Sequence, residues 1–336
     1  MELLVALGLV CLSFGGIWWV GRGLYRRVFF DSIVARHTRN QGSKPVQAMT
    51  AALEENAQAE FAELANNASM NDLRELKNRG DVADHPGRVA VFPGYAKNHP
   101  NDARAQYLNG CYLVRKAWAA RGSGTADTLS DSDVEKFHGQ LSDGQAALRG
   151  SIELDPNMPD AYAEMLIVIR GAGSEAEAGN LFDEARNRFP NDIQLHQNML
   201  LLLTARWMGS DETVLEFARN YGNSDSTGNL TCLIPFAHLE IWYGSDSEIV
   251  TYFKDKNIRR EIKAAFKQFI VSSDDGQQSQ GRLDGLQYFA CAFGMMGDNK
   301  NGKKAFKKMR GGYSSAAWRM WEDPEVLFTK AKLAVT

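Results

Sequence analysis

The stretch LFDEARNRFPNDIQLHQNMLLLL, residues 181–203, contains two apolar helical runs separated by a short polar turn. Within the turn, a proline cannot continue the first helix, and the Asn and Asp side chains after it can cap the second. The stretch therefore predicts two helices folded back on each other. The architecture then depends on whether the same turn recurs along the 336 residues, a length that suits either two domains or an elongated repeat array.

Similar turns occur twice before this one, as NHPND at 98–102 and LDPNMPD at 154–160. Pro156 and Pro190 are 34 residues apart, a spacing typical of one class of helical repeat. Pro100 lies more than one such spacing before Pro156, and a polar stretch near 122–140 supplies an insertion that accounts for the extra residues. Because strand-like alternation of apolar and polar residues does not persist in the sequence, we expect an all-α chain.

The clearest repeat covers residues 159–192. Its first helix offers large apolar residues, and its second offers small, aromatic, small and proline positions: Tyr162, Met165, Leu166 and Ile169, then Ala178, Phe182, Ala185 and Pro190. In this pattern the chain resembles the tetratricopeptide repeat (TPR) superfamily, in a membrane-anchored bacterial form. The resemblance is strong over 100–208 and weaker beyond, and it implies a helix-turn-helix α-solenoid.

The N-terminal stretch LLVALGLVCLSFGGIWWV, residues 3–20, carries no charged side chain. As a helix it would extend about 27 Å, enough to cross the hydrocarbon core of a bilayer. Arginines follow the stretch, and bulky Trp18 and Trp19 stand where a signal peptide would be cut. We therefore expect an uncleaved, single-pass transmembrane anchor at 1–21 rather than a cleaved signal peptide. The arginines place the C-terminal part in the cytoplasm, with a bacterial inner membrane as the expected location.

The rest of the chain divides by composition and pattern. We expect a basic juxtamembrane linker at 22–45, a helical N-terminal cap at 46–85, TPR-like repeats at 86–254, and degenerate repeats with a C-terminal cap at 255–336. In the N-terminal cap, Met49, Leu53, Ala57 and Phe61 fall four apart and predict one helix that docks on a neighbour. Ser69 is the expected N-cap of a second piece.

Several function classes are disfavoured by composition and missing motifs. A net charge of −3 argues against a nucleic-acid partner, which would normally require a basic surplus. The four cysteines are widely separated and fit neither a disulfide framework nor a zinc site. Because the usual catalytic and nucleotide-binding motifs are also missing, we expect no catalysis, no cofactor and no metal.

Two polar segments each allow two interpretations. DSDVEKFHGQ, around His138, is more typical of a solvated loop than of a metal site. KNGKKAFKKMR, at 300–310, is the densest basic run. It predicts either the solvated face of a helix whose apolar side carries Phe306 and Met309, or a second contact with anionic lipid headgroups. The solvated face is the commoner case.

The TPR resemblance also implies a concave face, lined by the first helix of each pair, that holds a protein or peptide partner. Carrying the family's positions onto this sequence gives a candidate peptide-binding groove formed by Arg104, Tyr107, Arg115, Glu164, Arg170, Gln194, Gln197 and Asn198. The arginines would clamp a carboxylate and Tyr107 would anchor an apolar group. The alternative is that these polar residues only solvate a concave wall.

Three hypotheses follow for function. The first is a membrane-anchored, non-catalytic scaffold or adaptor that binds other proteins in the groove, with residues 3–20 in the bilayer. The second is a structural subunit of a membrane complex that uses the outer helix faces instead. The third is an enzyme with a site in the 211–336 half, built on His238, Glu240 and Asp246. The sequence does not indicate the oligomeric state.

Overall fold

The computed structural model describes residues 43–78, 82, 86–121, 130–224, 227–245, 249–271 and 280–309, with 317, 318, 328, 331 and 332 near the C-terminus. In these ranges all secondary structure is helical, which confirms the all-α prediction. The predicted anchor at 1–21 lies outside the described residues. Within them, no helix has both the length and the hydropathy that crossing a bilayer would require.

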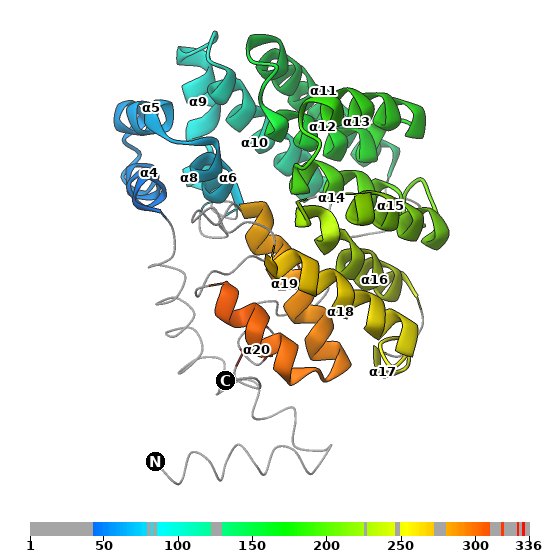
Figure 1. Cartoon of the computed structure of the whole chain (residues 1–336). Helices are drawn as coiled ribbons and strands as arrows, with labels where there is room; N and C mark the ends of the chain where they lie inside the picture. Colours follow the sequence, from blue (N-terminus) through cyan, green and yellow to red (C-terminus); the bar gives the residue numbers. More distant parts are fainter. Residues whose placement is uncertain are drawn as a thin grey trace, which may run out of the picture.

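The helices follow one another with short connections (Figure 1). Their bounds are α4 Lys44–Glu54, α5 Gln58–Asn67, α6 Met70–Asn78, α8 Pro86–Val89, α9 Val91–Asn98, α10 Ala103–Arg121, α11 Asp131–Leu154, α12 Pro159–Ala172, α13 Glu175–Arg188, α14 Ile193–Leu202, α15 Asp211–Ser224, the 3-10 helix η3 Asn229–Cys232, α16 Leu233–Gly244, α17 Ile249–Tyr252, α18 Lys256–Val271, α19 Gln280–Met296 and α20 Asn299–Lys308.

The helices α10 and α11 form a closely packed antiparallel pair. A Cβ added at Gly110 would lie 2.6 Å from Leu148, and one added at Gly144 would lie 2.8 Å from Val114. At the other end of the pair, the Ser151 hydroxyl donates to the carbonyl of Ala103 at 2.8 Å. Since residue numbers fall on one helix as they rise on the other, the two run in opposite directions. The glycines permit the close approach.

The pair α12 and α13 confirms the helical hairpin expected over 159–192. Ala178, Phe182 and Ala185 on α13 are buried, as the small and aromatic positions of the repeat require. Ser174 caps α13 by accepting from the amide of Glu177, and Asp192 caps α14 by accepting from the amide of Leu195. The turn quoted at the start therefore joins two packed helices, and the Asp after the proline starts the second.

The pairs lie beside one another in a row that runs from α10 to α20 (Figure 1). The helix α12 packs on α11 and α14, α14 packs on α16, and α16 packs on α18 and α19. The N-terminal helices do not extend this row. Instead, α6 contacts α10, which begins the row, and α19, which lies close to the end of the row. The N-terminal cap thus lies against one side of the row, which we call the inner side; the opposite side is the outer side.

The N-terminal cap differs from the single helix that its apolar stripe predicts. Met49, Leu53 and Phe61 are buried as expected, but the chain turns between α4 and α5. Asn56 makes that turn with a φ of 55°, a left-handed conformation that Asn adopts more easily than most residues. Ser69 does cap α6, because its hydroxyl accepts from the amide of Asp72 at 3.2 Å, and the Asp72 carboxylate accepts from the amide of Ser69 at 3.0 Å.

The prediction of a solvated loop around His138 was wrong. Residues 131–140 form the first turns of α11, which Ser130 caps by accepting from the amide of Asp133. Phe137 is buried against Trp118 at a centroid distance of 5.0 Å, whereas His138 is exposed. The polar composition of this stretch reflects the exposed side of a long helix, and its one apolar ring supplies the packing.

The C-terminal part of the row is closed by aromatic residues. The Trp318 indole donates to Gln287 of α19 at 2.6 Å, and Phe328 lies edge-on to Trp318 and to Phe306 of α20. Trp318 and Phe328 are buried, in agreement with the expected cap, while Trp321 lies outside the described residues.

Candidate functional site

The inner side of the row holds a buried ion-pair network around α6. Arg74 of α6 makes a two-pronged contact with Asp160 of α12, in which Nη2 donates to Oδ2 at 2.8 Å, and it also donates to Asp192 at 3.3 Å. Burial alone would lower the pKa of Arg74, but the two carboxylates outweigh it and raise the pKa above its ordinary value. The guanidinium therefore stays charged in a site that water hardly reaches.

A second cation of α6 lies one helical turn farther along. Lys77 is ion-paired with Glu164 of α12, and both side chains are buried. Its ammonium also lies 5.5 Å from the ring centroid of Tyr107, which is fully buried. Glu164 and Tyr107 were both expected to face a peptide in the groove. In the structure they hold Lys77 of the same chain.

Two of the predicted arginines bind the ends of the N-terminal helices. Arg104 donates to the carbonyls of Asn66 and Ala68 at 2.8 Å each, and Arg115 donates to the carbonyl of Lys77 at 2.9 Å. The last carbonyls of a helix lack partners within it and carry partial negative charge. Arg104 and Arg115 thus cap α5 and α6 rather than clamp a free carboxylate.

The other predicted groove residues are dispersed. Asn198 donates to the carbonyl of Ala163 at 2.6 Å, which joins α14 to α12. Gln197 is buried nearby, and Gln194 is half-buried. Arg170 lies at the far end of α12, where its guanidinium stacks on Trp118 and on Trp207, each at 5.3 Å. These four residues do not form one clamp.

The predicted groove thus contains α6 at the position expected for a peptide. Binding of a separate partner on that face stays a prediction, and it would require the partner to replace Arg74 and Lys77. Arg74 and Lys77 were not expected from the sequence, because both lie in the segment predicted to be the N-terminal cap. A signal was present, since cations three apart on a short helix complement the carboxylates of Asp160 and Glu164, which are four apart on another.

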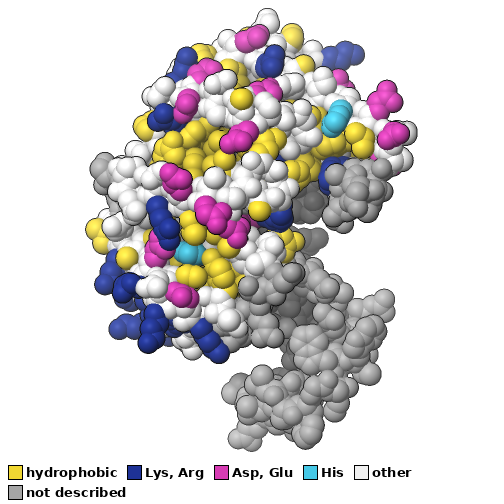
Figure 2. Space-filling view, turned by 90° about the vertical axis from the view of Figure 1, so that its right-hand side faces the viewer, with side chains coloured by type: hydrophobic (Ala, Val, Ile, Leu, Met, Phe, Trp, Pro, Cys, Tyr) yellow, Lys and Arg dark blue, Asp and Glu magenta, His cyan; other side chains and the backbone are white. Residues whose placement is uncertain are grey.

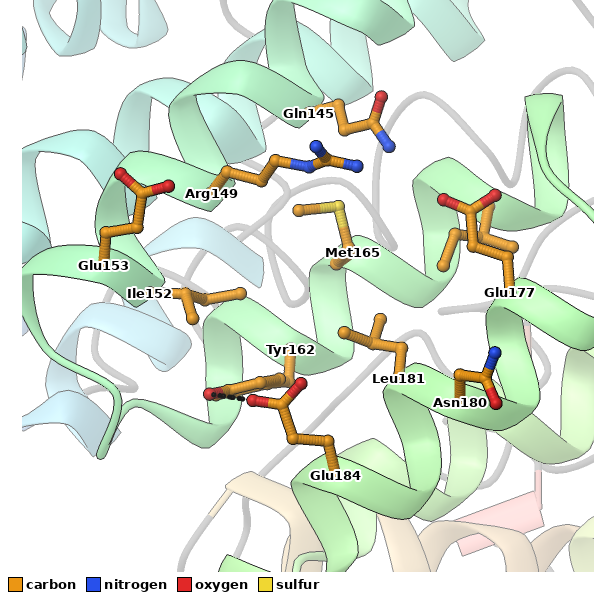
Figure 3. Close-up of a pocket in the computed structure, with 11 residues that line it drawn as sticks. Gln145, Arg149, Ile152, Glu153, Tyr162, Met165, Glu177, Asn180, Leu181 and Glu184 are labelled. Atoms are coloured by element: carbon orange, nitrogen blue, oxygen red, sulfur yellow. Dashed lines mark hydrogen bonds between the residues drawn. The ribbon is translucent and has the colours of Figure 1, made fainter.

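An open groove lies on the outer side, between α11 and α13, with α12 at its floor. Its volume is about 340 Å³, and its apolar lining comes from all three helices: Ile152, Tyr162, Met165, Ile169 and Leu181. Figure 3 shows Ile152, Met165 and Leu181 between the polar side chains of the rim. Figure 2 shows hydrophobic side chains gathered on the upper half of this face, where Figure 1 places α11 and α13.

The rim of the outer groove is acidic. Among the described residues that line the groove, Glu153, Glu177 and Glu184 are accompanied by a single cation, Arg149, and by the amides of Gln145 and Asn180. Glu184 also accepts a hydrogen bond from the Tyr162 hydroxyl at 3.2 Å, which fixes the edge of the floor. The arrangement can bind an apolar side chain flanked by positive charge. The repeat pattern predicted Tyr162, Met165 and Ile169 of the floor as packing positions, and the rim residues were not identified from the sequence as a site.

Of the three residues named in the enzyme hypothesis, the structure describes His238 and Glu240, and these two have separate partners. His238 contacts the Tyr252 hydroxyl at 2.9 Å and Glu261 at 3.2 Å, whereas Glu240 is ion-paired with Arg206. Asp246 lies outside the described residues. Burial, and then nearby carboxylates, raise the pKa of Tyr252 above its ordinary value, which opposes a phenolate nucleophile.

Glu261 is the centre of this second polar cluster. Hydrogen bonds from His238 and then from Arg219 lower the pKa of Glu261 to about 2. Arg219 of α15 approaches with two nitrogens at 2.8 and 3.0 Å, and His238 belongs to α16. The carboxylate on α18 therefore joins three helices. In the part of the chain that the structure describes, His, Cys, Asp and Glu side chains nowhere gather in threes that could hold a metal ion.

Comparison of the chain with protein-family models gives no match, and comparison with curated proteins gives none either.

Removing a cation from the buried inner network should destabilise the fold more than removing one from an exposed ion pair. Replacing Arg74 by Met leaves the buried Asp160 without its partner, so we expect a loss of about 3–5 kcal/mol in the free energy of unfolding. The matched control is Arg186→Met, because Arg186 forms an exposed pair with Asp183, and this should change stability by less than about 0.5 kcal/mol. Denaturant unfolding followed by circular dichroism measures both. Equal, small effects would contradict the role given to α6.

Glu261 predicts a pH-dependent contribution to stability. Its lowered pKa means that the folded state binds the proton more weakly than the unfolded state, whose Glu titrates near 4.5. The stabilisation is therefore complete above about pH 5 and is lost as the pH falls toward 2. Because the side chain is 26% exposed, we expect Glu261→Gln to cost about 2 kcal/mol at pH 7 and little at pH 2. A pH-independent difference between the two proteins would contradict this assignment.

Proposed function

We propose that the protein is a membrane-anchored, TPR-like scaffold that binds a partner protein through the outer groove between α11 and α13. The observation that carries the proposal is the groove itself, an open hollow with an apolar floor and an acidic rim. Concave sites of this size, apolar with a few polar groups, are the usual form of binding sites. The inner side is the weaker candidate, because α6 fills it.

A tetratricopeptide-like solenoid is supported by several local features. The hairpin over 159–192 has the small and aromatic positions buried between its helices, and successive pairs pack side by side. The part of the insertion that the structure describes, residues 130–140, forms the start of the long helix α11 and does not break this order. In a solenoid each pair contacts mainly its neighbours, which leaves grooves between second helices open to solvent.

The chemistry of the groove indicates what the partner must offer. Ile152, Met165 and Leu181 favour one or two aliphatic or aromatic side chains, and the three glutamates favour flanking Lys or Arg. An amphipathic helix with an apolar stripe bordered by basic residues provides both. We therefore expect a basic amphipathic segment of another protein rather than an acidic C-terminus.

The second candidate function is a permanent subunit of a membrane assembly. A permanent subunit would use the same outer surface as the scaffold proposed above, and it would differ from a transient adaptor in the lifetime of its complex. The occupied inner face favours it over a free adaptor that captures peptides in its concavity, since Glu164 and Tyr107 are already engaged. Co-migration of the detergent-extracted chain in one stable complex would distinguish a permanent subunit from a transient adaptor.

Site-specific photocrosslinking in intact cells tests the groove. We expect a photoreactive residue at Asn180, on the rim, to give a discrete crosslinked protein, whereas the same residue at exposed Asn220 of α15 gives none. The double variant Ile152→Glu and Leu181→Glu should abolish the adduct, because it puts charge on the apolar floor. Leu154→Glu is the matched control, since Leu154 is 43% exposed on α11 and does not line the groove.

Two outcomes would contradict the proposal. One is an adduct that persists in the groove variant while that variant remains folded by circular dichroism. The other is an equal loss of the adduct in the Leu154→Glu control, which would indicate a general effect on the row rather than occupation of the groove.

A further inference from the structure

The helix α20 is amphipathic, with its cations on one side. Lys300, Lys303, Lys304, Lys307 and Lys308 are all exposed. The opposite side carries Ala305 and Phe306, which are buried, and Met309 is buried just after the helix. This confirms the apolar side that the sequence predicts and leaves the function of the charged side to be explained.

A second helix adds cations that sequence analysis did not connect with α20. On α18, Ile262, Phe266 and Phe269 are buried. The opposite side carries Lys256, Arg260 and Lys267, which are exposed and are spaced by four and then seven residues, or about one and two helical turns. Val271 continues the same side and is 82% exposed. The exposed side of α18 is thus basic with an aliphatic end.

The structure fixes these two helices to each other. Lys263 of α18 is ion-paired with Asp298, the N-cap of α20, at 2.8 Å. Arg259 donates to the carbonyl of Met296, at the end of α19, at 2.7 Å. The exposed cations of both helices therefore belong to one surface, which we call the basic face. It consists of Lys256, Arg260, Lys267, Lys300, Lys303, Lys304, Lys307 and Lys308.

Among the residues that the structure describes, three carboxylates near the basic face have other partners. Asp298 holds Lys263, and Glu261 holds Arg219 and His238. Asp255 accepts from the amides of Asn257 and Ile258 at the start of α18. Since the whole chain has a net charge of −3, this positive surface stands against an acidic surplus in the remaining residues. Figure 2 shows one group of Lys and Arg side chains at the lower end, where Figure 1 places α17, α18 and α20.

We propose that the basic face docks on the anionic phospholipid headgroups of a bilayer. Lysines on flexible stems fit a fluid layer of phosphates, because each finds a headgroup without a fixed geometry. The exposed Val271 suits the boundary between headgroups and acyl chains. A surface for single-stranded nucleic acid would add stacking aromatic rings, but the phenylalanines of α18 and α20 are buried. The proposal extends the proposed membrane tether by orienting the row above the bilayer.

Vesicle flotation and lysine acetylation of the full-length protein test this inference. The probes are vesicles of phosphatidylcholine alone and vesicles with added phosphatidylglycerol. We expect the anionic vesicles to slow acetylation of Lys300, Lys304 and Lys307 about fivefold at low salt, and high salt to remove the protection. Exposed lysines elsewhere, Lys97, Lys116 and Lys136, provide the internal control and should react equally with both vesicles.

A charge-removal variant completes the test. Lys300→Gln, Lys304→Gln and Lys307→Gln together should abolish the difference between the two vesicle types at Lys256 and Lys267. The control variant, Lys97→Gln, Lys116→Gln and Lys136→Gln, should leave it intact. These positions are exposed, so both variants should keep the fold.

The outcomes separate the basic face from the tether. A chain that floats with both vesicles, yet shows no protection of the basic face, overturns this inference and supports the tether. Flotation with anionic vesicles alone supports the basic face and contradicts the tether. Flotation with neither contradicts both. Stronger protection of the same lysines by random-sequence duplex DNA than by anionic vesicles would also overturn the inference.

Discussion

The pairing of Arg74 and Lys77 with carboxylates on α12 is the constraint on which the arrangement of the chain depends. Charges that are removed from water must be matched, because an unmatched one costs several kcal/mol. Here Asp160 and Glu164 lie four residues apart on α12, and the two cations lie three apart on α6. The match holds the N-terminal helices against the inner side of the row. It also determines which surfaces remain open to other molecules.

The surfaces that remain open differ in charge. The groove between α11 and α13 has three glutamates and one arginine on its rim. The surface of α18 and α20 carries eight exposed cations. A basic segment of a partner and an anionic bilayer are thus favoured at different places on one molecule. This division of charge agrees with the two proposals, that the protein binds a partner in the outer groove and docks on a bilayer through the basic face.

Sequence patterns predicted the local structure well. Pro190 and Asp192 located the corner between α13 and α14, because both residues act within one turn of helix. Ala178 and Phe182 indicated the hairpin by size alone. The bend at Asn56 was missed, since a continuous apolar stripe conceals a single left-handed residue. The helical start of α11 was missed because exposed helix and polar loop have similar compositions.

The candidate sites could be predicted less well, for a physical reason. Whether Glu164 faces a peptide or Lys77 depends on where a separate segment packs, and that contact spans 87 residues of chain. Likewise, the outer groove is lined jointly by residues of α11, α12 and α13, and no single helix encodes that arrangement. The helices α18 and α20 are joined by the ion pair between Lys263 and Asp298, two residues that α19 separates in the sequence.

Amide hydrogen exchange of α6 in the full-length protein tests most directly whether the buried ion pairs hold this helix against the row. If buried ion pairs hold α6 in place, amides in residues 73–78 should exchange as slowly as those of α12, because both become accessible only when the row opens. Fast exchange of α6, at the rate of a fraying terminal helix, beside a protected α12 would show that the inner side is free. In that case the concave face, and not the outer groove, would be the surface available to partners.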